Sequence, residues 1–249
     1  FDAAHWNLDN ARVVEQAGRQ AVAGLAVLKD VEFEDGVIEF DVWAPDVRQT
    51  GGRAYPGVIF RMRTPQQAER LYIRPHRAGL YADAIQYTPV FNGVAGWQLY
   101  SGEGFSNTLQ FSFSAWVPVR VEVTGRRARV FVGKAGAPAL VINDLKHGLS
   151  KGALALYGEG AAFFSNFRYD LGKSPEFPPP PPAGAVPGVI ADWELSRGFP
   201  ALLLDTEEYP DPKMLAEAKW RKVSAEPSGL VDVARFAAFN GVEPESVAE

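Results

Sequence analysis

The chain has 249 residues and a formal net charge of −5, with 47% hydrophobic and 22% charged residues. This composition is ordinary for a globular protein, and the acidic balance argues against nucleic acid, which is bound through Lys and Arg. The chain contains no cysteine, which excludes disulfides, thiolate metal sites and cysteine nucleophiles. No apolar run approaches the roughly 20 residues that a membrane span needs, so we expect none.

Short runs of β-forming residues, separated by turn signals, follow one another as far as residue 169. We expect strands at residues 37–42, 58–63, 71–74, 84–88, 97–100, 117–124, 128–132, 139–142, 153–157 and 162–169. Residues 10–20 suggest a helix at first, but Gly18 and Gly24 interrupt them and no 3.6-residue period persists, so strands are expected there too. Closely spaced short strands favour an all-β sandwich or barrel.

Prolines indicate one domain boundary. Pro175, the run from Pro178 to Pro182, and Pro187 exclude a helix or a central strand and favour extended polyproline II structure. We therefore expect a β domain over residues 1–172, a proline-rich linker over 173–188, and a small mixed segment over 189–249 that contains β-structure. In the last segment we expect strands at 192–196 and 230–236 and a short helix at 213–219.

Several expected strands have one apolar and one polar face, because successive side chains in a strand point to opposite sides. If these strands are neighbours in the sheet, their polar faces line up on one accessible surface. Polar planar groups bind sugar hydroxyls, and aromatic rings stack on the apolar side of a pyranose. The predicted ligand-binding residues are Arg61, Tyr72, Arg74, His76, Gln86, Asn92, Trp97, Gln98 and Tyr100, with Glu39 and Asp41 as acidic candidates. A merely solvated face would show the same alternation.

Three strand blocks resemble the concanavalin A-like (laminin G-like) jelly-roll superfamily: GVIEFDV at 36–42, YPGVIFR at 55–61 and FFSNFRY at 163–169. More narrowly, they are similar to bacterial family-16-like, or 3-keto-disaccharide hydrolase-type, domains. The resemblance covers residues 1–172 and implies a jelly-roll β-sandwich. Because this superfamily includes lectins, glycosidases, lyases and adhesion modules, the resemblance implies no single activity. Its members often bind calcium through loop carboxylates, for which Asp30, Asp35 and Asp144 are candidates.

The carboxylates expected of a family-16 glycosidase are incomplete in this chain. That family carries Glu-x-Asp-x-Glu, or the same pattern with one extra residue, and retaining glycosidases need two such carboxylates. Glu39 and Asp41 begin the pattern, but Trp43 and Ala44 stand where the second Glu is required.

A polysaccharide lyase would need a base and a group that neutralises a uronate. The candidates for this chemistry are Arg61, Tyr72, Arg74, His76 and Gln98.

Three functions therefore stay open. The one we favour is an exported carbohydrate-binding module, which predicts an open groove on the polar face. The second is a glycoside hydrolase or polysaccharide lyase, which predicts a deep pocket. The third is a structural or adhesion module without a sugar site. The chain begins at Phe1 rather than Met, which is compatible with removal of a signal peptide, and we expect an extracytoplasmic (periplasmic or secreted) location.

Overall fold

The computed structural model describes residues 1–48, 52–172, 176–179, 192–193 and 222–224. The chain divides into two units, Phe1–Pro178 and Pro179–Glu249. In the second unit, β14 (Asp192–Trp193) pairs antiparallel with β15 (Lys222–Ser224). The helix expected at 213–219 and the strand expected at 230–236 lie outside the described residues, and the bounds of the expected linker stay a prediction.

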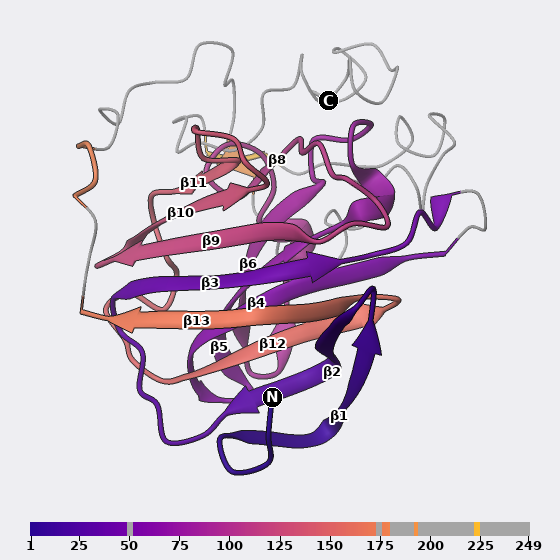
Figure 1. The fold of residues 1–249 in the computed structure, drawn as a ribbon. Coiled ribbons are helices and arrows are strands. Elements are labelled where there is room, and N and C mark those ends of the chain that lie inside the picture. The colour runs from indigo at the N-terminus through magenta and orange to yellow at the C-terminus, as the bar shows by residue number, and fades with distance from the viewer. Residues whose placement is uncertain (49–51, 173–175, 180–191, 194–221, 225–249) are drawn as a thin grey trace. The chain divides into compact units, whose positions relative to one another are not determined.

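The first unit is built from antiparallel strands that form one curled sheet (Figure 1). The order across the sheet is β11-β10-β9-β3-β13-β2-β12-β4-β5-β6-β7, with β1 paired to β2 and β8 paired to β6. The strands are β1 (Trp6–Gln16), β2 (Arg19–Leu28), β3 (Gly36–Trp43), β4 (Ala54–Thr64), β5 (Gln67–Ile73), β6 (Ile85–Phe91), β7 (Val94–Ala95), β8 (Ser106–Asn107), β9 (Val117–Thr124), β10 (Arg127–Val132), β11 (Leu140–Ile142), β12 (Ala153–Gly160) and β13 (Phe163–Leu171).

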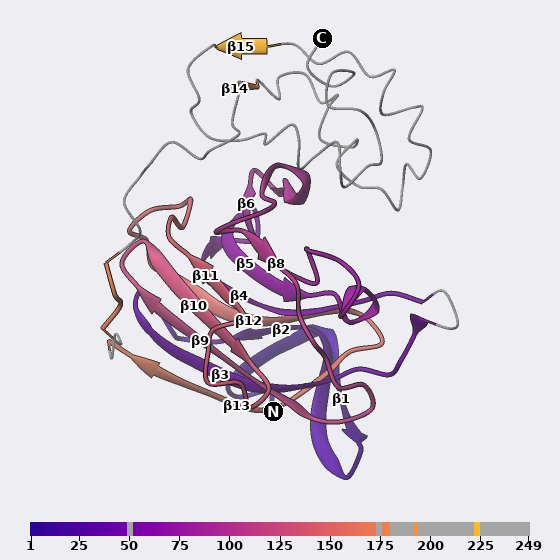
Figure 2. The same ribbon diagram turned by 90° about the horizontal axis from the view of Figure 1, so that it is seen from above.

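The curl brings two layers of strands face to face. Strands β9, β3 and β13 lie in front of β4, β5 and β6 in Figure 1, and Figure 2 separates the same two layers when seen from above. Phe40 and Val121 from one layer and Phe60 and Leu71 from the other belong to one buried hydrophobic cluster. The predicted all-β antiparallel sandwich is therefore confirmed for this unit.

The hairpin between β1 and β2 confirms that residues 10–20 form strands. Its two-residue turn, Ala17 and Gly18, has φ values of 47° and 73°, the left-handed backbone that fits the twist of a tight hairpin. On β3, side chains alternate between the two faces of the sheet as expected, and Ile38, Phe40 and Val42 are buried. Within the described residues, no helix is long and apolar enough to cross a membrane.

The strand expected at residues 97–100 is wrong. Trp97–Leu99 forms a short 3-10 helix, η3, because the backbone N–H of Leu99 bonds to Gly96 O at 2.9 Å and that of Tyr100 bonds to Trp97 O at 3.3 Å. The segment is attached to β6, where Gln86 Nε2 donates a hydrogen bond of 2.7 Å to Trp97 O. The 3-10 helix η3 therefore covers β6, in place of the strand that was expected at these residues.

A bulge in β4 turns Arg61 toward the interior. Between the pairs Phe60↔Glu69 and Thr64↔Gln67, β4 advances by twice as many residues as β5, and the register with β12 shifts at the same place. Arg61 has a φ of 49°, so strict alternation fails there. Gly152 packs against this bulge, since a Cβ on it would lie 2.5 Å from Met62.

Arg61 ties three loops to β4 through its guanidinium group. It donates to Glu34 O at 2.7 Å, Gly148 O at 2.9 Å and Gly125 O at 2.6 Å, and it forms an ion pair of 2.9 Å with Asp35. The residue is 1% exposed, so these acceptors replace water as its partners. The prediction that Arg61 lies on an accessible polar face is wrong, because the bulge moves it off that face.

We expect Arg61→Met to lower the free energy of unfolding by about 3 kcal/mol, because it leaves the Asp35 carboxylate and three carbonyls without this donor. Guanidinium denaturation followed by tryptophan fluorescence measures the change. The control is Arg63→Met, an exposed position two residues on, where a change within about 0.5 kcal/mol is expected. Equal destabilisation by both variants would contradict the tethering role of Arg61.

Candidate functional site

The polar residues predicted on β5 and β6 come together, but most of them are buried. Tyr72 is 4% exposed, Arg74 5% and Gln86 1%. All six residues of β6 from Ile85 to Val90 are buried, because η3 and neighbouring chain cover the side that was expected to face solvent. The open polar face predicted for these strands is therefore wrong.

These buried side chains satisfy one another's hydrogen bonds. Arg74 donates to the Tyr72 hydroxyl at 2.8 Å and forms an ion pair of 2.6 Å with Asp83. The Tyr72 hydroxyl in turn donates to Gln86 Oε1 at 2.8 Å. Burial raises the pKa of Tyr72 to about 12, so its hydroxyl stays protonated and available as this donor at neutral pH. Arg77 also binds Asp83, at 2.6 Å, and the cluster forms a structural network.

Four further predicted contacts, His76, Trp97, Gln98 and Tyr100, lie around the rim of this network. His76, in η2 (Pro75–Arg77), meets the ring of Tyr55 edge-on at 5.3 Å, and Arg74 lies over the ring of Trp97 at 5.3 Å. Gln98 and Tyr100 are half-buried on and beside η3. Their assignment as ligand contacts stays a prediction.

Asn92 is separated from this cluster. It lies in the turn after β6 and accepts a hydrogen bond of 3.0 Å from Gln67. Six residues of extended strand, about 20 Å, separate it from Gln86, so these two residues do not share one small site.

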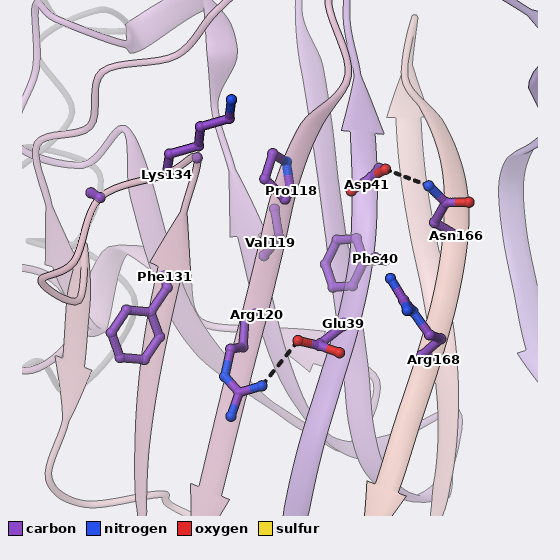
Figure 3. Close-up of a pocket in the computed structure, with 12 residues that line it drawn as sticks. Glu39, Phe40, Asp41, Pro118, Val119, Arg120, Phe131, Lys134, Asn166 and Arg168 are labelled. Carbon is purple, nitrogen blue, oxygen red and sulfur yellow. Dashed lines mark hydrogen bonds and ion pairs between the residues drawn. The ribbon is translucent and has the colours of Figure 1, made fainter. Parts of the chain in front are cut away.

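A groove lies instead on the outer face of the other layer, over β13, β3, β9 and β10 (Figure 3). Its volume is about 320 Å³. Both acidic candidates from the sequence, Glu39 and Asp41, lie in it. The lining residues are Glu39, Phe40, Asp41, Pro118, Val119, Arg120, Phe131, Gly133, Lys134, Ala135, Asn166 and Arg168.

Register places four groove residues in one row across four strands. Arg168 on β13 pairs with Glu39 on β3, Glu39 pairs with Arg120 on β9, and Arg120 pairs with Phe131 on β10. At the usual spacing between strands, the row is about 14 Å long. Three charged side chains of alternating sign, followed by one aromatic ring, therefore lie along one line on an accessible surface.

Arg120 is fixed between two carboxylates. It forms ion pairs of 2.9 Å with Glu39 and with Glu122, and Glu122 also pairs with Arg129 at 2.7 Å. Partial burial lowers the pKa of Arg120, but hydrogen bonds to Glu122 and Glu39 outweigh it, so the pKa lies above its usual value. The guanidinium group and the Glu39 carboxylate are thereby held in place side by side.

Asp41 is held from the other end of the groove. Its carboxylate accepts from Arg19 at 2.6 Å and from the side-chain amide of Asn166 at 2.7 Å. Arg19 also lies over the ring of Trp116, 5.2 Å from its centroid. Asn166 has a φ of 53° at a bulge in β13, and this bulge brings its amide to Asp41.

Two of the three loop carboxylates proposed for calcium, Asp35 and Asp144, are engaged with cationic side chains. Asp35 binds Arg61, and Asp144 pairs with Arg126 at 2.5 Å and with Lys146 at 2.8 Å. Across the described part of the chain, no three His, Asp or Glu side chains gather closely enough to hold a metal ion.

Sequence reasoning found the two acids of the groove and missed its other members. Arg120 and Phe131 are separated from Glu39 by more than eighty residues, and only the pairing of β3 with β9 and of β9 with β10 brings them together. The alternation of β9, with Val119 and Val121 buried and Arg120 between them, was the available signal for an outward-facing arginine.

No family model and no curated protein matches this sequence. Among solved structures, the carbohydrate-binding module CBM66 from Bacillus subtilis matches with 15% identity and a TM-score of 0.50, covering 67% of this chain and 95% of that chain. Chicken galectin 2 matches with 11% identity and a TM-score of 0.42, covering 57% and 95%. A Bacillus subtilis protein of unknown function with a galectin-like fold matches with 10% identity and a TM-score of 0.48, covering 66% and 88%.

At these identities the likeness concerns the fold alone. The similarity to CBM66 agrees with the curled all-β architecture, and the narrower resemblance to family-16-like domains stays a prediction.

Proposed function

We propose that the first unit binds carbohydrate in the groove over β13, β3, β9 and β10. The observation that supports this most directly is the row in which Glu39 and Arg120, already paired at 2.9 Å, lie beside Phe131 on an accessible surface. Adjacent acceptor and donor groups suit vicinal hydroxyls, and an aromatic ring suits the apolar side of a pyranose.

The ion pairs around the groove prepare it for a ligand. Arg120 holds Glu39, while Arg19 and Asn166 hold Asp41. Because these side chains are already ordered, little rotamer entropy remains to be lost when a ligand binds. Carboxylates that are paired and yet partly exposed can still accept further hydrogen bonds through their second oxygen or remaining lone pairs.

The groove supports a binding function more than a catalytic one. The carboxylates among its lining residues are Glu39 and Asp41, which lie two residues apart on one face of one strand. The family-16 pattern needs a further Glu on this strand to complete the pair of catalytic carboxylates, and Trp43 and Ala44 stand in its place. The extracytoplasmic location expected from the sequence fits a role in binding external glycans.

Glu39→Gln and Asp41→Asn are each expected to weaken glycan binding about 10- to 100-fold, because each removes a charged acceptor while keeping the size of the side chain. A glycan array identifies the ligand and titration calorimetry measures the dissociation constant. Glu15→Gln on β1, which lies outside the groove, is the matched control and should bind like the wild type. Unchanged affinity in both groove variants would contradict the proposal.

Arg74→Ala tests the other face of the sandwich. Removing this buried side chain takes away the donor to the Tyr72 hydroxyl and leaves Asp83 with Arg77 as its remaining cationic partner, so we expect the free energy of unfolding to fall by about 3 kcal/mol. The folded variant should retain wild-type glycan affinity. Loss of affinity with unchanged stability would instead place the ligand over β5 and β6. Arg126→Ala, at an exposed ion pair, should cost less than about 1 kcal/mol.

A further inference from the structure

The carboxylates in the groove already have cationic partners of their own. Glu39 is paired with Arg120, and Asp41 is paired with Arg19 from outside the lining. These ion pairs neutralise both carboxylates of the groove, so any further cation among the lining residues has no carboxylate there to pair with.

Two further cations line the groove, Arg168 and Lys134. Both are exposed, and neither makes an ion pair or hydrogen bond with any residue of the described segments 1–48, 52–172 and 176–179. They contrast with Arg19, Arg120 and Arg129 beside them, each of which binds a carboxylate. Three cationic side chains thus face two anionic ones among the lining residues, on a chain whose net charge is −5.

The two unpaired cations lie on opposite sides of the groove. Arg168 comes from β13, and Figure 3 shows its side chain extending toward β3. Lys134 follows β10, and the backbone N–H of Gly133 holds this loop to β9 by a hydrogen bond of 2.8 Å to Pro118 O. A ligand lying across β3 and β9 would have one cation at each side.

We propose that the groove selects an acidic oligosaccharide, in which Arg168 and Lys134 bind carboxylate or sulfate groups while the paired residues bind hydroxyls. This inference rests on the proposed function. A guanidinium group offers two parallel donors that match the geometry of an oxyanion, and an ammonium group offers a point charge. A locally positive groove on an acidic protein also concentrates anionic ligands near itself.

The test is a glycan panel in which each uronic-acid oligosaccharide is paired with its methyl ester, and each sulfated one with its desulfated form. We expect the acidic member of a pair to bind at least about 10-fold more tightly than its neutral partner, and this ratio to fall as salt is added. The uronic-acid and sulfated pairs show separately which oxyanion is preferred.

Arg168→Gln and Lys134→Gln are each expected to reduce the acidic-to-neutral affinity ratio about 10-fold while leaving the melting temperature unchanged, because both side chains are exposed and unpaired. Arg12→Gln on β1 makes the same change of charge outside the groove and should keep the ratio. Equal affinity for acidic and neutral members, or a ratio that neither groove variant alters, would overturn the inference while sugar binding stands. Binding to no glycan at all would overturn the proposed function as well.

Discussion

The buried guanidinium group of Arg61 holds one end of the sandwich together. Its four acceptors come from the chain before β3, the turn between β9 and β10, and the chain before β12. A buried charge without partners would cost several kcal/mol, so these loops must stay where they satisfy it. The strands that carry the groove, β3 and β9, are therefore positioned relative to β4 by a residue that touches no part of the groove.

The two outer faces of the sandwich use similar residues for different purposes. Over β5 and β6, Arg74, Tyr72 and Gln86 bind one another and are sealed beneath η3. Over β3 and β9, Glu39 and Arg120 bind each other but keep contact with solvent, with side chains about 40% exposed. Polar side chains buried without water serve the stability of the fold, because their donors and acceptors are occupied. Polar side chains that are paired and exposed can serve recognition.

The groove carries more positive than negative side chains, and this excess is what would favour an acidic ligand. Each carboxylate has its own cation, and the surplus charge sits on Arg168 and Lys134 at opposite sides. The paired groups define a neutral, preorganised floor over β3 and β9, whereas the unpaired cations have freedom to move toward an oxyanion. This division separates the general affinity for hydroxyl groups from a preference for acidic ones, so the two properties depend on different residues.

The sequence by itself determined most of the strands, since alternation in residues such as Ile38, Phe40 and Val42 reports burial directly, and with them the all-β class. It also identified Glu39 and Asp41 as acids on an outward face. Only the tertiary structure decided that Arg61 turns inward at a bulge, that η3 seals Gln86, and that Arg120 and Arg168 stand on either side of Glu39. The physical reason is that alternation depends on neighbouring residues, whereas bulges, covering segments and cross-strand partners depend on chain far away in sequence.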